Sequence, residues 1–281
     1  MEPKLIHSLR SVAIAATATF GMCLPSFGQK LPPAEVAHLY SQDLDKRISD
    51  DFNGPIEWDT KWTYRANMGG KDQIAICQDE ADPDNKYVSI KALGSTRKGA
   101  GLCTMNDSKY GFYIVKWRTK GIVDGVKNNW HPSTWASCVN FGVNKRDKGR
   151  PYQRIELDLM EGFGIPDWGS HLNAWTGKST QVYTLKERTK VFPKDGEWSV
   201  IGMEYTPDYI AGWEFKDGKW NLVKTIEFTA DKNDGKKLNY SHREHVYWIH
   251  SNIFIDMKAP ATDSEYQVDY FYHYPYKCEE R

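Results

Sequence analysis

Residues Tyr152-Gln153-Arg154-Ile155-Glu156-Leu157-Asp158-Leu159-Met160-Glu161-Gly162, near the middle of the chain, place three carboxylates among apolar side chains. Side chains alternate between the two faces of a β-strand, so Arg154, Glu156 and Asp158 share one face. The third carboxylate, Glu161, comes one residue too late for this alternation. A single β-bulge near Leu159-Met160 would return it to the polar face, and bulges are frequent beside active sites. The stretch therefore predicts a bulged strand with three acids on one face.

Three neighbouring acids repel one another, and on a partly buried face this favours retention of a proton by at least one of them. A pair of carboxyl groups, one protonated and one ionised, is what hydrolysis of a glycosidic bond requires. The alternative is a solvated amphipathic strand. The spacing of one short motif does not decide between these two interpretations.

The rest of the chain is rich in short runs of alternating, β-branched or aromatic residues. They include residues 87–93, 111–117, 198–205 and 268–274, and turn sequences such as Lys194-Asp195-Gly196 separate such runs. Many short strands with little helical periodicity predict an all-β sandwich or jelly roll. No linker, low-complexity tract or internal repeat divides the 281 residues, so we expect one domain.

The N-terminus has the pattern of a secretory signal peptide. A charged lead precedes the mostly apolar run from Ser11 to Leu24, and Ser26-Phe27-Gly28 offers small residues for cleavage. The apolar run is short for a membrane span. We therefore expect a signal peptide over residues 1–28, a mature domain over residues 29–281, and a secreted or periplasmic protein without a membrane anchor.

Composition restricts the partners of the chain. Basic and acidic residues balance at 37 each, so no global field favours nucleic acid, and we expect a monomer with no nucleic-acid partner. The 11 tryptophans would serve as core filler or as flat platforms for sugar rings. Cys77, Cys103, Cys138 and Cys278 of the mature chain allow three disulfide pairings, and buried thiols are the alternative.

Several segments occur in an order known from one enzyme family. They are Asp51-Phe52-Asn53-Gly54, Lys109-Tyr110-Gly111-Phe112-Tyr113, Ser133-Thr134-Trp135, Glu156-Leu157-Asp158-Leu159-Met160-Glu161, His171-Leu172-Asn173, Glu204-Tyr205-Thr206-Pro207-Asp208 and Val268-Asp269-Tyr270-Phe271-Tyr272. In these segments the chain resembles glycoside hydrolase family 16, the family of laminarinases, lichenases, agarases, porphyranases and carrageenases. Ile114 and Val115 depart from the family pattern, which often has Glu-Ala there.

The resemblance implies a β-jelly-roll sandwich of two antiparallel sheets with a concave cleft for a polysaccharide substrate, and hydrolysis with retention. It casts Glu156 as the nucleophile, Glu161 as the general acid/base and Asp158 as their helper. Glu156 and Glu161 lie roughly 13 Å apart along the backbone, and inward-leaning side chains would narrow this towards the ~5–5.5 Å that suits retention. This chemistry requires no cofactor.

The resemblance also suggests substrate-binding residues. Trp135 matches the tryptophan that floors the sugar site, although a core tryptophan is the alternative. His171 matches a cleft histidine near the acid/base. Trp130, Asn173 and Trp175 are weaker candidates, chosen because they lie close in sequence to these elements.

Arginine placement favours one branch of the family. Arg154 falls on the acid face, and a basic loop spans residues 145–150. These groups would neutralise the acids or form bidentate contacts with a sulfate ester. We therefore expect a red-algal galactan, of agarose, porphyran or carrageenan type, as substrate. The alternatives are a β-1,3- or β-1,3-1,4-glucanase of the same family, or a lectin-like sandwich that binds sugar without cleaving it.

Some family members carry a structural calcium ion on the convex face. Asp51 and Asp269 match positions involved there. Calcium takes six to eight oxygen ligands, so these two acids give only the beginning of a site.

Overall fold

The computed structural model describes residues 27–65, 68, 70–94, 99–121, 131–137, 153–162, 168–176, 179–189, 193–227, 251–258 and 262–277. Most of the expected signal peptide lies outside these ranges, as do Trp130, Cys138, Cys278 and the basic loop 145–150. Cys77 and Cys103 lie inside them and are free thiols.

Fourteen strands of the described residues form two antiparallel sheets of seven strands each. The first, here called the β7 sheet, has the order β1 (Trp62–Tyr64), β4 (Ala100–Ser108), β13 (Ser251–Lys258), β6 (His131–Ser137), β7 (Gln153–Gly162), β8 (Trp168–Thr176), β9 (Ser179–Thr189). The second, the β14 sheet, has the order β12 (Lys219–Glu227), β11 (Tyr209–Lys216), β10 (Ser199–Tyr205), β5 (Gly111–Lys120), β14 (Ser264–Pro275), β3 (Lys86–Ala92), β2 (Ile74–Gln78).

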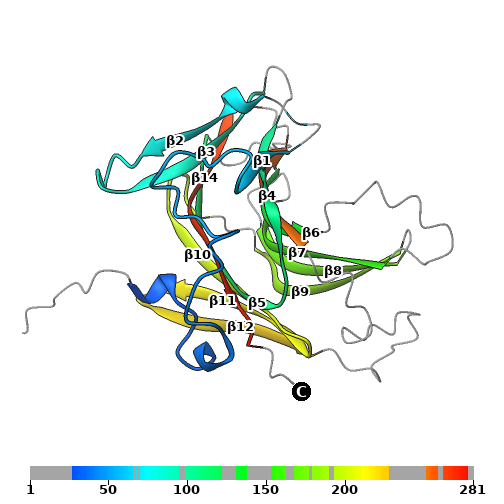
Figure 1. Cartoon of the computed structure of the whole chain (residues 1–281). Coiled ribbons are helices and arrows are strands. Elements are labelled where there is room, and N and C mark those ends of the chain that lie inside the picture. The colour runs from blue at the N-terminus through cyan, green and yellow to red at the C-terminus, as the bar shows by residue number, and fades with distance from the viewer. Residues whose placement is uncertain are drawn as a thin grey trace, which may run out of the picture.

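The two sheets face each other across one apolar core (Figure 1). Leu157 and Ile255 reach this core from the β7 sheet, and Val115 and Phe271 reach it from the β14 sheet. Helix is limited to three short 3-10 turns in the described residues, η1 (Phe27–Lys30), η2 (Ala37–Leu39) and η3 (Lys71–Gln73). The expected all-β jelly-roll sandwich is confirmed. None of the described helices is long and apolar enough to cross a membrane.

The predicted strands are confirmed as β3, β5, β10 and β14. The predicted turn at Lys194-Asp195-Gly196 also forms, and Gly196 adopts a φ of +83° that favours glycine.

The outer face of the β14 sheet is aromatic and is covered by the N-terminal segment. The hydroxyls of Tyr270 and Tyr274 donate to the carbonyls of Gln29 and Lys30, at 3.2 and 2.8 Å. Trp220 Nε1 donates to the carbonyl of Leu31 at 2.8 Å. In Figure 1 the blue segment accordingly lies beside β11 and β12. Both faces of β14 are therefore covered, which explains why residues 270–275 of this strand are apolar or aromatic at every position except His273.

His273 of β14 is buried at 2% exposure, with its ring 4.5 Å from the ring of Tyr113. The space that its imidazole fills would be taken by any side chain at position 111, so Gly111 is needed there. Burial lowers the pKa of His273 to about 4, and the carboxylate of Asp45, 4.0 Å away, opposes burial only in part. His273 is therefore neutral in the folded protein at neutral pH.

This histidine makes stability pH-dependent. The pKa of His273 is lower in the folded protein than in the unfolded chain. Its contribution to the free energy of unfolding is therefore complete above about pH 6.5 and is lost as pH falls towards 4. We expect the free energy of unfolding to fall by on the order of 3 kcal/mol from this group between pH 7.5 and pH 4. Urea unfolding at each pH measures it. His273→Gln should flatten the profile between pH 6.5 and 4, and a profile of unchanged steepness would contradict the assignment.

Candidate active site

The predicted β-bulge lies in β7. Across the β6–β7 pair, Thr134 is opposite Met160 and Trp135 is opposite Asp158, so Leu159 has no partner. The β7–β8 pair shifts register over the same interval, between Asp158 and Glu161. The extra residue that the sequence required is therefore present where it was predicted.

The bulge sends two consecutive side chains into the core. Leu159 and Met160 are 1% and 0% exposed and both belong to the core between the sheets. Glu161 then returns to the opposite face, which it shares with Asp158 and Glu156. Asp158 is 3% exposed, and both glutamates are half-buried. The three acids thus lie on the face of the β7 sheet that points away from the core.

Ser170 of β8 stabilises the bulge. A bulge removes one carbonyl from the regular ladder, and a buried carbonyl without a donor is costly. The Ser170 hydroxyl donates to the carbonyl of Leu159 at 2.5 Å, which supplies that donor. The side chain of Ser170 is buried, so the contact is shielded from water.

Trp135 lies on the acid face beside Asp158, its partner across β6 and β7. Its ring stacks on Phe254 of β13, with centroids 4.3 Å apart and planes 19° apart. Together with Cys103 the two rings form a small apolar cluster separate from the core. Only 9% of Trp135 is exposed, so on the acid face it is nevertheless as buried as a core tryptophan.

His171 also lies beside Asp158, from the β8 side. It is 6% exposed, and its Nδ1 lies 3.3 Å from the Thr184 hydroxyl. Its Nε2 occupies the space above Gly169, which any side chain at that position would fill. Gly169 is the backbone partner of Glu161. The imidazole therefore leans from the row of Asp158 towards the row of Glu161.

The remaining predicted contacts are placed only by their backbone. Arg154 pairs with Trp175, and Asn173 pairs with Glu156, across β7 and β8. Their side chains lie outside the described part of the structure. Trp130 lies outside it altogether.

Two residues that the sequence analysis did not identify complete the site. Asp256 of β13 is fully buried, accepts a 2.7 Å hydrogen bond from Trp135 Nε1, and forms an ion pair with Arg65 Nη1. The Arg65 guanidinium lies 4.9 Å from the Trp135 ring centroid and 5.4 Å from that of Phe254. The sequence signal for Asp256 was its position as a charged residue between Ile255 and Met257. No sequence signal pointed to Arg65.

The side chains at the expected calcium site do not fit a calcium ion. The carboxylate of Asp269 is buried, 2.6 Å from Lys116 Nζ and 3.0 Å from Asn85 Nδ2. Asp51 is exposed and accepts from the backbone N–H of Asn53. Within the described ranges no group of three or more His, Cys, Asp or Glu side chains gathers. A lysine ammonium takes the position of a cation beside Asp269 and would repel a metal ion.

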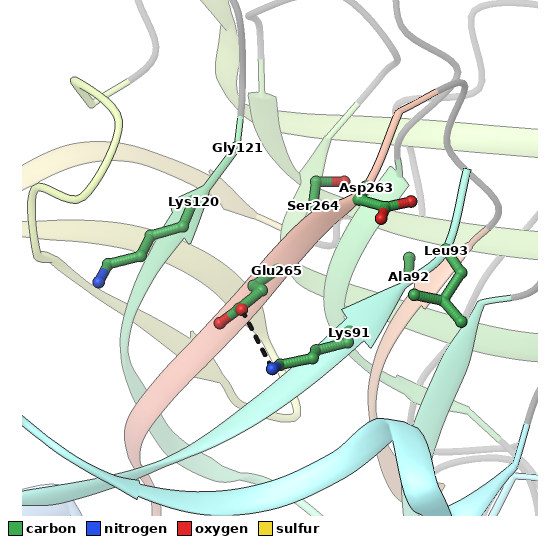
Figure 2. Close-up of a pocket in the computed structure, with 8 residues that line it drawn as sticks. All are labelled: Lys91, Ala92, Leu93, Lys120, Gly121, Asp263, Ser264 and Glu265. Atoms are coloured by element: carbon green, nitrogen blue, oxygen red, sulfur yellow. Dashed lines mark ion pairs between the residues drawn. The ribbon is translucent and has the colours of Figure 1, made fainter. Parts of the chain in front are cut away.

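A hollow of about 330 Å³ lies at one end of β3, β5 and β14 (Figure 2). Lys91 and Glu265 face each other there at 3.6 Å. Burial raises the pKa of Glu265, but donors from Gln267 and Ser89 and the charge of Lys91 together hold it below its usual value. The charges at this hollow are thus matched within the protein, and none of the predicted site residues lines it.

The Ser170 contact predicts a measurable cost. Ser170→Ala leaves the Leu159 carbonyl buried without its donor, so we expect the free energy of unfolding to fall by about 1–3 kcal/mol. Urea denaturation of the wild type and the variant measures the difference. Ser41→Ala, at a hydroxyl that accepts only one exposed backbone hydrogen bond, should change it by less than about 0.5 kcal/mol. Equal stability of wild type and Ser170→Ala would refute this role.

The Lys116–Asp269 pair predicts that stability does not depend on calcium. We expect the same Tm in EDTA and in millimolar calcium. Lys116→Met should lower the free energy of unfolding by roughly 2–4 kcal/mol, because it leaves a buried carboxylate without its cation. Lys219→Met, at an exposed lysine, is the matched control. A Tm that drops in EDTA would restore the calcium hypothesis.

Comparison by sequence does not place the chain in a family. No family model matches it. One curated protein that it matches is the isoleucine--tRNA ligase of Staphylococcus saprophyticus, at 21% identity over 145 residues. That match covers 48% of this chain and 15% of the ligase, a share that supports no functional assignment.

Comparison by structure finds enzymes that cleave glycans. One is an endo-acting O-glycanase of the human gut microbiota, linked to mucin breakdown, with 17% identity, a TM-score of 0.56 and coverage of 84% of this chain and 100% of that one. A κ-carrageenase from Zobellia galactanivorans has 12% identity, a TM-score of 0.56 and coverage of 85% and 99%. An endo-1,3-β-glucanase (laminarinase) catalytic domain from Thermotoga petrophila has 15% identity, a TM-score of 0.51 and coverage of 85% and 99%. The chain therefore has the fold of these glycan-cleaving enzymes along most of its length.

Proposed function

We propose that the protein is a secreted, retaining endo-glycoside hydrolase that cleaves a β-linked galactan of the red-algal type. The observation that carries this proposal is the bulge in β7, which returns Glu161 to the face of Glu156 and Asp158. A regular strand would have buried Glu161 in the core. The shared fold with a carrageenase and a laminarinase supports a glycosidase, and the resemblance to family 16 supports the roles of the three acids.

In the proposed mechanism the Glu156 carboxylate attacks the anomeric carbon while Glu161 gives its proton to the leaving glycosidic oxygen. The result is a glycosyl ester on Glu156. The Glu161 carboxylate then takes a proton from water, and this water attacks the same carbon and releases Glu156. The sugar keeps its configuration because inversion occurs twice.

The neighbours of the acids are suited to supporting roles. Asp158 is nearly buried between the two glutamates and is placed to orient Glu156. His171 is buried and leans towards the Glu161 row, which suits a role in orienting that carboxyl. The Trp135–Phe254 stack offers an apolar surface beside Asp158.

The glucanase and lectin-like alternatives make different predictions. A β-glucanase would use the same three acids on laminarin or mixed-linkage glucan. A lectin-like sandwich would bind sugar without turnover, and it gains nothing from three neighbouring acids, which favours an enzyme.

The decisive experiment measures release of reducing ends from agarose, porphyran, κ-carrageenan, laminarin and lichenan. We expect cleavage of a galactan by the wild type and a loss of about 10³-fold or more in Glu156→Gln, because the nucleophile is removed. Glu57→Gln, which alters an exposed carboxylate paired with Lys61, is the control and should retain activity. Substantial turnover by folded Glu156→Gln would refute the nucleophile, and preference for laminarin would refute the galactan.

A further inference from the structure

We propose that Arg65 contacts the substrate and determines specificity, and that its pairing with Asp256 adapts it to the hydroxyls of an uncharged sugar rather than to a sulfate ester. This inference rests on the proposed function and narrows its substrate class. It concerns the part of the acid face beyond Trp135, on the side of β13 and β1.

The strand registers place this pair on the face of the acids. Asp256 is opposite Ser133, and Ser133 is opposite Glu161, so the three lie in one row across β13, β6 and β7. Neighbouring strands are about 4.8 Å apart, which puts β13 roughly 10 Å from β7. A glycan chain that crosses the acids can therefore pass over Trp135 and reach Arg65.

The two residues of the pair differ in burial, and this difference indicates which of them can contact a ligand. The Asp256 side chain is fully buried, whereas the Arg65 side chain is 22% exposed. Gly101 makes this close packing possible, because a Cβ at that position would lie 2.5 Å from the Cβ of Asp256. Asp256 cannot touch a ligand, so it is a positioning residue that fixes both Arg65 and the Trp135 indole. Arg65 can touch a ligand, because its guanidinium carries five N–H donors and the hydrogen bond to Asp256 uses only the Nη1 group.

Charge decides which ligand suits this arginine. Arg65 is already compensated by the carboxylate of Asp256. Beyond the pair, the carboxylates of Glu156 and Asp158 add negative charge on the same face, whereas Glu161 carries its proton in the proposed mechanism. A sulfate would meet a neutralised guanidinium and these two carboxylates, whereas a hydroxyl accepts a hydrogen bond from Arg65 with no charge of its own to be repelled. The arrangement thus favours an uncharged hexose unit that accepts hydrogen bonds from Arg65.

The test compares ligands that differ in sulfate. Agaro-oligosaccharides, κ-carrageenan oligosaccharides and the chemically desulfated form of the latter are assayed for cleavage, and are titrated calorimetrically into Glu156→Gln protein. Each measurement is repeated with Arg65→Gln, Asp256→Asn and Arg47→Gln. Arg47 is the matched control, because it is an exposed arginine paired with the carboxylate of Asp45.

We expect Arg65→Gln to raise KM and the Kd for neutral oligosaccharides about tenfold or more, with a smaller change in kcat, and Arg47→Gln to change neither. Asp256→Asn keeps the acceptor for Trp135 and Arg65 but removes the compensating charge. It should therefore move the ratio of sulfated to neutral affinity towards the sulfated ligand by about tenfold. A merely structural role of Asp256 would lower both affinities together.

Contrary results separate the two proposals. Unchanged binding by Arg65→Gln, or tighter wild-type binding of the sulfated ligand that Arg65→Gln abolishes, would overturn the inference even if the enzyme cleaves a galactan. Absence of cleavage by the wild type would count against the proposed function, while the titrations still decide on Arg65. If none of these ligands binds, both the Arg65 inference and the proposed function are overturned.

Discussion

The candidate site depends on one irregularity, the bulge at Leu159. The core requires apolar side chains on one face of β7, and the proposed chemistry requires Glu161 on the other. In a strand with strict alternation, Glu161 would lie on the same face as Leu157 and Leu159, so this sequence could not meet both requirements. The bulge does so by burying Leu159 and Met160 in succession. The extra residue leaves a carbonyl to be satisfied, and the Ser170 hydroxyl satisfies it. The position of the acids thus follows from packing constraints on the opposite face.

The same sheet carries a second constraint at β13. Its core-facing residues Ile253, Ile255 and Met257 follow the ordinary alternation. The residues between them, Phe254 and Asp256, face the acids and are nevertheless buried, because Trp135 and Arg65 cover them. The face that bears the acids is therefore itself closely packed on one side. This packing fixes the Trp135 indole at its ring by Phe254 and at its N–H by Asp256.

The sequence predicted what depends on local order and missed what depends on distant pairing. The bulge was readable because Glu161 breaks the alternation by one residue, and the strands were readable from runs of apolar and aromatic residues. Arg65 and Asp256 are 191 residues apart in the sequence and meet only because β1, β4 and β13 are neighbours. Likewise, nothing local indicates that Lys116 lies against Asp269, so the sequence alone leaves Asp269 as a candidate calcium ligand.

The Arg65–Asp256 pair is better explained by recognition than by stability. The pair removes the Asp256 carboxylate and most of the Arg65 side chain from water, and apolar residues of similar volume would often stabilise a fold as well or better. Phe254 and Trp135 already provide an apolar cluster at this place. What the ion pair adds is a fixed set of hydrogen-bond donors with its charge compensated. Such donors suit a neutral, hydroxyl-rich ligand held beside three acids, where an unpaired arginine would be drawn to the carboxylates themselves.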